Sequence, residues 1–111
     1  HGDGDQIRSW CYVDDIVDGI LLCLENEQCI GQVFNIGNPR ATVTILSLAE
    51  KIKSLAQSSS EIVFMPKNYI DVELRIPDIK KCKDILGFTP KIDLSEGLSR
   101  TIDWYRENPQ L

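Results

Sequence analysis

The sequence predicts an α/β fold with a few short strands and about four helices, which together form part of a larger sheet system. Two observations support this prediction. Segments with the apolar spacing of helices alternate with short runs of β-favouring residues along the whole chain. The expected strands are also too few and too short to make a complete open sheet of the usual size.

The N-terminal half is predicted to alternate strand and helix. Residues 7–13 (IRSWCYV) follow a turn-rich start and favour an extended conformation. Asp14 or Asp15 is expected to cap a helix, because apolar residues with the spacing of one helical face follow them. Residues 32–36 (QVFNI) are predicted to form a short strand that ends at the turn 37–39 (GNP).

The middle of the chain repeats this order. Thr44 is a suitable cap for a helix whose apolar residues fit helical spacing up to Ala56. Residues 61–65 (EIVFM) are predicted to form another strand, which Pro66 stops. Residues 67–77 show no clean period and are predicted to be a loop with extended pieces.

Two helices are expected to close the chain. Asp78 is predicted to cap the first, which runs to Leu86, and Gly87 stands where a left-handed residue commonly ends a helix. Asp93 and Glu96 have the spacing of a capping box at the start of the second.

Composition excludes several classes of function. The chain has 111 residues, 17 acidic against 12 basic, and a net charge of −5, whereas a nucleic-acid groove needs a basic surplus. No apolar run approaches the ~18 residues that span a bilayer, so we expect no membrane partner and a cytoplasmic location. The lack of an initiator Met predicts a piece of something longer.

Cysteine and histidine usage argues against a metal site. The chain has one histidine, His1, at its terminus, and its four cysteines contain no C-x-x-C spacing, so we expect no zinc. A Ser-His or Cys-His nucleophile is excluded for the same reason. Reduced, mostly buried thiols are expected for a cytosolic protein. The cysteines are Cys11, Cys23, Cys29 and Cys82.

The candidate binding residues are polar side chains in extended segments and loops. Gln6 and Arg8 are two positions apart, so both point to one face, and an amide with a guanidinium suits a pyrophosphate or a sugar hydroxyl. The alternative for Arg8 is an ion pair with a nearby Asp. Arg75 lies among acidic residues, and a salt bridge to one of them is its alternative. Tyr69 either stacks on a base or covers core.

Several segments resemble one enzyme family along almost the whole chain. Residues 2–15 (GDGDQIRSWCYVDD) look like the G-x-G-x-Q-x-R-x-x-x-Y-V-x-D stretch of extended short-chain dehydrogenases that act on nucleotide sugars. Residues 34–39 (FNIGNP) resemble the strand and turn that follow there. Residues 75–79 (RIPDI), 86–91 (LGFTPK) and 96–105 (EGLSRTIDWY) are similar to its closing signature.

This resemblance implies that residues 1–111 are the C-terminal, substrate-binding part of such an enzyme, without the half that holds the cofactor. The family's glycine-rich dinucleotide loop and its Tyr-x-x-x-Lys pair find no match in the chain. We therefore expect NAD in the longer enzyme, but neither NAD binding nor catalysis by this chain alone. A UDP-sugar or another nucleotide sugar is the implied ligand.

Within the family, the nearest resemblance is to UDP-glucuronate decarboxylases, one group of which has a very similar Tyr-x-Asp-Val-Glu-x-Arg-x-Pro segment. It implies that Gln6, Arg8 and Tyr69 contact substrate, and that Arg75 contacts substrate or acts as an acid. We favour anion binding for Arg75, because the pKa of a guanidinium is too high for ready proton donation.

Three alternatives to the decarboxylase remain open at this point. The chain resembles part of a 4,6-dehydratase or of a 4-epimerase as well, because these enzymes share the Gln-x-Arg and closing features. An inactive binding module that keeps only the fold is the third. We expect the isolated chain to self-associate and the longer enzyme to be a homo-oligomer.

Overall fold

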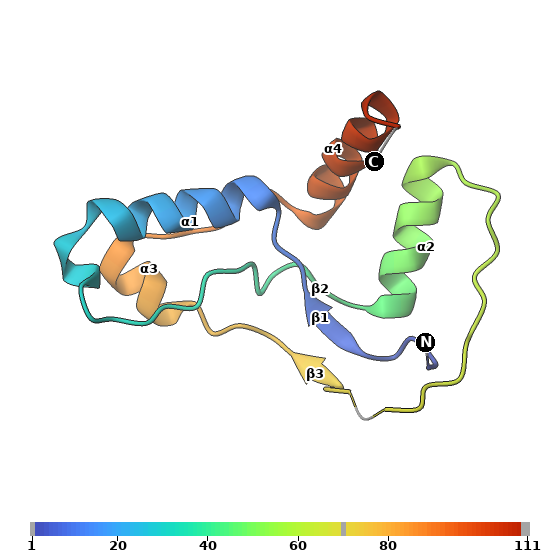
Figure 1. Cartoon of the computed structure of the whole chain (residues 1–111), viewed down its shortest axis with the longest axis horizontal. Helices are drawn as coiled ribbons and strands as arrows, with labels where there is room; N and C mark the ends of the chain where they lie inside the picture. Colours follow the sequence, from blue (N-terminus) through green and yellow to red (C-terminus); the bar gives the residue numbers. More distant parts are fainter. Residues whose placement is uncertain (1, 70, 110–111) are drawn as a thin grey trace.

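The computed structural model describes residues 2–69 and 71–109, so His1 lies outside the described part. Within this part, four α helices, one 3-10 helix and three strands follow one another along the chain (Figure 1). The α helices are α1 (Val13–Glu25), α2 (Ile45–Ala56), α3 (Lys80–Leu86) and α4 (Leu94–Glu107), and the 3-10 helix is η1 (Glu27–Cys29). The strands are β1 (Ile7–Ser9), β2 (Thr42–Thr44) and β3 (Leu74–Arg75).

The three strands form one small sheet at the centre of the molecule, in the order β2-β1-β3. β1 runs antiparallel to β2, with Ser9 opposite Thr42, and parallel to β3, with Arg8 opposite Arg75. Both edges of β1 are therefore occupied. In Figure 1, α1 and α3 lie on one side of this sheet, and α2 and α4 lie on the other. This mixed architecture confirms the predicted α/β class.

Two predicted strands are wrong. Residues 32–36 and 61–65 belong to neither a helix nor a strand. A strand needs a hydrogen-bonded neighbour, and neither segment joins the β2-β1-β3 sheet. Ile36 nevertheless packs closely against α1, because a Cβ built on Gly19 would lie 2.6 Å from its Cγ2.

The predicted helix caps are partly confirmed. Thr44 accepts a hydrogen bond from the backbone N–H of Ser47, and Asp93 accepts one from Glu96. Gly87 ends α3 in the left-handed conformation, with φ of 67°. The cap predicted for α1 is wrong, because its N-cap is Tyr12, which makes no side-chain cap bond.

Asp78 supports α3 from just outside the helix. The N-cap is Ile79, one position later than predicted, and Asp78 Oδ1 accepts a hydrogen bond of 2.8 Å from the first helical N–H, at Lys80. The predicted acid is therefore used, but in a turn that precedes the helix.

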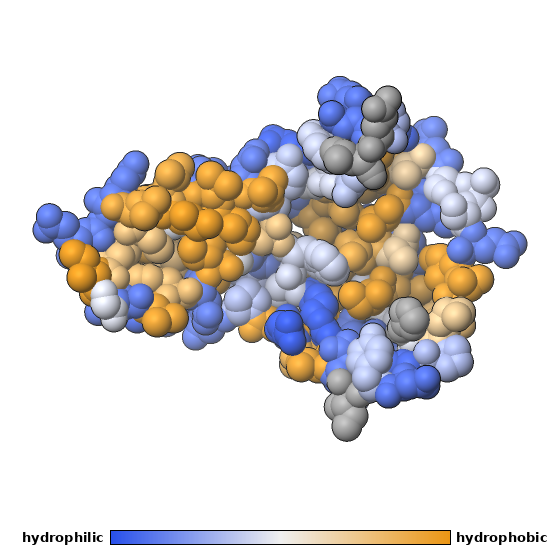
Figure 2. Space-filling model, in the orientation of Figure 1, coloured by the Kyte–Doolittle hydropathy of each residue, from blue (hydrophilic) through white to orange (hydrophobic). Residues whose placement is uncertain are grey.

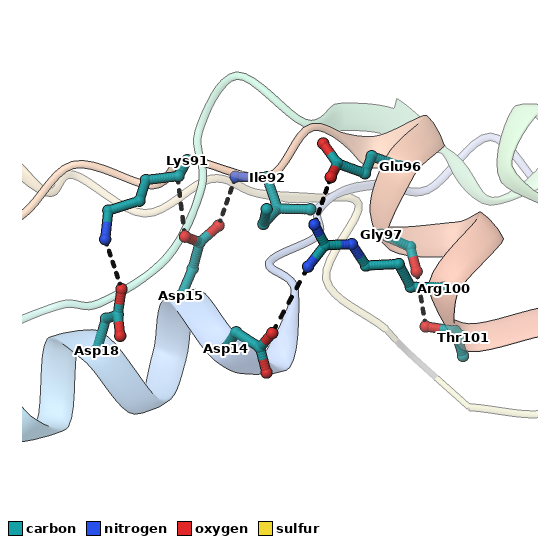
Figure 3. Close-up of polar contacts among 9 residues, drawn as sticks. All are labelled: Asp14, Asp15, Asp18, Lys91, Ile92, Glu96, Gly97, Arg100 and Thr101. Atoms are coloured by element: carbon teal, nitrogen blue, oxygen red, sulfur yellow. Dashed lines mark hydrogen bonds and ion pairs between the residues drawn. The ribbon is translucent and has the colours of Figure 1, made fainter. Parts of the chain in front are cut away.

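Asp15 connects α1 to the segment that leads into α4 (Figure 3). It is 2% exposed, and its two carboxylate oxygens accept backbone hydrogen bonds from Lys91 (2.9 Å) and Ile92 (3.0 Å). The ammonium of Lys91 pairs with Asp18 one turn further along α1, at 2.8 Å. This hydrogen bond is the main reason that the pKa of Lys91 is raised. The carboxylate that we expected at a cap instead joins two segments distant in sequence.

A second connection lies at the start of α4 (Figure 3). The guanidinium of Arg100 donates to Glu96 at 2.5 Å and lies 3.7 Å from Asp14 of α1. The same group stacks over the ring of Tyr12, 5.5 Å from its centre. Exposed pairs of this kind contribute little stability, so we expect them mainly to orient α4 against α1.

The buried core is small for a chain of this length. The buried apolar residues are Ala41, Leu48, Cys82, Leu86 and Phe88, and the last three form one cluster. The radius of gyration is 16.5 Å, larger than the roughly 13 Å of a compact domain of about 100 residues. The chain is therefore open, with much of its apolar surface outside the core.

One apolar face of α1 lies on the surface. Figure 2 shows hydrophobic side chains gathered over this helix. The exposed residues of this α1 face are Val13, Val17, Ile20, Leu21 and Leu24. Contiguous apolar patches of this kind mark interfaces or aggregation sites.

The isolated chain is expected to self-associate through the α1 face. Sedimentation velocity over a range of concentrations should show species larger than the monomer. Leu24→Lys should shift the distribution toward monomer, because Leu24 is 77% exposed and a charge there disrupts the patch without loss of packing. Ser59→Lys adds the same charge in a remote loop and should leave the distribution unchanged. A monodisperse monomer at high concentration would contradict this prediction.

None of the described helices has both the length and the apolar character needed to cross a bilayer.

Candidate functional site

The parallel pairing of β1 and β3 brings Arg8 and Arg75 together. The two residues are register partners, although 66 positions separate them in the sequence. Opposite residues of neighbouring strands point to the same face of a sheet, so the two guanidinium-bearing side chains leave the sheet on one side. The pairing is anchored by the backbone N–H of Ile7, which donates to the carbonyl of Glu73 at 2.7 Å.

Arg8 is held by several neighbours. Its side chain is 17% exposed and lies 3.2 Å from the carboxylate of Asp71. It also donates to the carbonyls of Ile7 at 2.9 Å and Glu73 at 3.4 Å. The alternative of an Asp partner for Arg8 therefore occurs, but the partner comes from the loop before β3 rather than from the neighbouring acids.

Arg75 differs from Arg8. It is exposed, and within residues 2–69 and 71–109 it forms no ion pair. The salt bridges that we considered with Glu73 and Asp78 are absent from this described part. Two like charges opposite each other in a sheet destabilise it unless an anion compensates them. Asp71 compensates Arg8, whereas Arg75 has no carboxylate partner among the described residues.

Gln6 lies at the entrance to the same strand. It is 8% exposed and lines an open hollow of 360 Å³ together with Lys67 and three acids, Asp3, Asp5 and Glu73. Its backbone carbonyl accepts from Ile45 at 2.9 Å. Its side-chain amide makes no hydrogen bond to the residues that the structure describes, so this amide is available to a ligand in the hollow.

Tyr69 lies next to Lys67, a residue that lines this hollow. The ring is 60% exposed, and the Lys67 ammonium lies 5.6 Å from its centre. Lys67 also lines the Gln6 hollow. The structure therefore places Arg8 opposite Arg75 in neighbouring strands. Gln6 and Tyr69 are each close to Lys67.

Asp71 was not among the candidate residues from the sequence. The available signal was a cluster of acids, Asp71, Glu73 and Asp78, around a single arginine. Spacing alone suggested that acids of this cluster pair with Arg75, whereas in the structure Asp71 pairs with Arg8. The choice depends on the β1–β3 register, which no local pattern contains.

A separate apolar hollow of 230 Å³ lies between α2 and α4. Trp10, Leu48, Ile52 and Leu98 are among the side chains that line it. Its single carboxylate, Asp93, is used as the cap of α4. Among the described lining residues Asp93 is the single charged side chain, so this hollow is poorly suited to a charged ligand. In the described residues, no group of three or more His, Cys, Asp or Glu side chains is arranged to hold a metal ion.

Comparison with known proteins assigns the family. A sequence profile described as GDP-mannose 4,6 dehydratase matches residues 1–101. The chain belongs to this family. UDP-glucuronic acid decarboxylase 1 of Arabidopsis thaliana is 43% identical over 106 residues, which cover 96% of this chain and 24% of that protein.

Solved structures of the family match the fold. UDP-glucose 4-epimerase of Thermotoga maritima, determined with UDP-glucose, gives a TM-score of 0.86 at 37% identity. This match covers 98% of the present chain and 34% of the other. UDP-glucuronic acid 4-epimerase of Bacillus cereus, determined with UDP-glucuronic acid and NAD, gives 0.87 at 29% identity, covering 96% and 34%.

These findings confirm the resemblance to the extended short-chain dehydrogenases and the prediction of a partial fold. The family modifies nucleotide sugars. The chain spans about a quarter of the curated relative and about a third of each solved structure.

Proposed function

We propose that this chain forms the nucleotide-sugar-binding side of a longer UDP-glucuronate decarboxylase. The pairing of Arg8 with Arg75 on one sheet face carries the proposal, because it offers two guanidinium groups to one anion. A nucleotide diphosphate has two adjacent negative groups, and arginine binds such groups through paired hydrogen bonds.

Electrostatics favours a ligand at this face. The chain as a whole carries a net charge of −5, so a pair of cations on one face is a local exception. Arg8 shares its charge with Asp71, whereas Arg75 has no carboxylate partner among the described residues. A diphosphate would satisfy both guanidinium groups and relieve their mutual repulsion.

Gln6 and Tyr69 would complete the contacts with the ligand. The nearly buried amide of Gln6 is suited to a sugar or ribose hydroxyl, because an amide both donates and accepts. The exposed ring of Tyr69 offers a face on which a base can stack. We assign Arg75 to anion binding rather than to proton donation, because a guanidinium offers five N–H donors and is not deprotonated in proteins.

The described residues do not fit NAD. No glycine-rich turn leads from a strand into the N-terminus of a helix in this part of the chain, and such a turn is what holds a dinucleotide pyrophosphate. We propose that NAD, which is bound in the Bacillus cereus relative, is held by residues outside this chain in the longer enzyme. The isolated chain should neither bind NAD in calorimetry nor convert a UDP-sugar.

Decarboxylation is favoured over the related reactions by the curated relatives. The Arabidopsis decarboxylase and a decarboxylase from Danio rerio, 41% identical over 105 residues, both match almost the whole chain. The epimerase alternative is supported by the matching solved structures, so the two reactions need a direct test.

Carbon-13 labelling of the substrate carboxylate separates these reactions. The longer enzyme, supplied with NAD and UDP-glucuronate labelled at its carboxylate carbon, is expected to release labelled CO2. Retention of the label in an epimerised product would identify an epimerase instead. Binding of UDP without any conversion of UDP-glucuronate would favour the inactive binding module.

A further inference from the structure

Three of the four cysteines meet at one end of the molecule. Cys23 lies near the end of α1, Cys29 lies in η1, and Cys82 lies in α3. Cys23 and Cys29 both pack against the buried cluster that contains Cys82. Figure 1 shows α1, η1 and α3 together on the side of the sheet away from α2 and α4. Cys11 lies elsewhere, beside the hollow between α2 and α4.

The turn between α1 and η1 brings Cys23 and Cys29 onto the same surface. Asn26 follows α1, and its side chain accepts a hydrogen bond from the N–H of Gln28 at 2.9 Å. The backbone N–H of Cys29 donates to the carbonyl of Asn26, also at 2.9 Å. The chain therefore reverses direction at Asn26. This reversal places the Cys29 side chain on the same surface as Cys23 of α1.

Exposure distinguishes this pair from the third cysteine. Cys23 and Cys29 are half-buried and line one open hollow of 430 Å³, whereas Cys82 is 0% exposed. The pKa of Cys29 is raised, first by burial and then by the neighbouring thiol of Cys23. Burial also raises the pKa of Cys82. Small oxidants can therefore reach Cys23 and Cys29, while Cys82 is enclosed.

We propose that Cys23 and Cys29 form a reversible disulfide site for peroxide-type oxidants. One thiol gives up its proton, and the thiolate attacks hydrogen peroxide to form a sulfenic acid while the O–O bond breaks. The hydroxide that leaves takes up the proton and becomes water. The second thiol then displaces the hydroxyl of the sulfenic acid as a second water, and the sulfur–sulfur bond forms. Two thiols and one hydrogen peroxide give one disulfide and two water molecules, and a dithiol reductant reverses the change. The bridge would tie the end of α1 to η1.

Intact-mass analysis of the whole chain after peroxide treatment is the test. We expect a loss of about 2 Da, one hydrogen from each thiol, which dithiothreitol restores. Cys29→Ser and Cys23→Ser should each abolish the loss, and Cys11→Ser should retain it.

Peptide mapping identifies the bridge. Trypsin leaves Cys23 and Cys29 on one peptide, because no lysine or arginine lies between Arg8 and Arg40. A second cut after Glu25 or Glu27 separates Cys29 from the fragment that carries both Cys11 and Cys23. In the Cys11→Ser variant, therefore, only a disulfide between Cys23 and Cys29 keeps the two fragments together. No loss of mass, or a bridge that contains Cys82, Cys11 or a second copy of the chain, would overturn the proposal. These outcomes do not depend on nucleotide binding.

Discussion

Replacement of Arg8 by alanine in the longer enzyme is expected to weaken UDP binding by about tenfold to a hundredfold. A hydrogen bond between charged groups contributes about 1.5–3 kcal/mol, and each 1.4 kcal/mol is tenfold in affinity. Arg8 is 17% exposed, so its contact with a phosphate would be partly shielded from water. Isothermal titration with UDP measures the change.

Two further variants make this result specific. Arg75→Lys should also weaken UDP binding, because an ammonium keeps the charge but loses the planar fork of donors. Arg100→Ala removes a positive charge that is engaged with Glu96 and Asp14, so it should leave UDP affinity unchanged. Equal losses in all three variants would show that only net charge matters, which would contradict a defined site.

Replacement of Phe88 by alanine is expected to cost about 3–5 kcal/mol of unfolding free energy. Phe88 is 2% exposed and belongs to the main buried cluster, with Cys82 and Leu86. Its ring also meets α1, since a Cβ on Gly19 would lie 3.2 Å from it. Folded domains have only about 5–15 kcal/mol in total, so the variant should be close to unfolded.

Urea denaturation followed by circular dichroism measures this effect. The matched control is Phe64→Ala, because Phe64 is 57% exposed and should cost less than about 0.5 kcal/mol. If both substitutions lowered the midpoint equally, the cluster around Phe88 would not be the main core of the chain.

Helices were predicted well because their signals are local. The caps at Thr44 and Asp93 and the left-handed Gly87 each depend on residues within one turn of the helix. Residues 32–36 and 61–65 have the composition of strands, yet neither joins the sheet, and residues 61–65 meet the N-terminal segment through a hydrogen bond from Gly2 N–H to the Met65 carbonyl. Pairing is a property of distant segments, so composition alone could not decide it.

The site shows the same limit. Spacing predicted that Gln6 and Arg8 share a face, because alternation along a strand is local. It could not show that Arg75 stands opposite Arg8, since that depends on the register of β1 and β3. The ion pair of Arg8 with Asp71 was missed for the same reason. The family resemblance indicated both arginines, but not their relation in space.

The affinity difference between UDP and uridine tests the central claim most directly. The two ligands differ only in the diphosphate, so this difference measures what the diphosphate contributes to binding. In the longer enzyme, UDP is expected to bind much more tightly than uridine, and the double variant Arg8→Ala/Arg75→Ala should bind both about equally. A double variant that still prefers UDP as strongly as the unmodified enzyme would show that Arg8 and Arg75 do not hold the diphosphate.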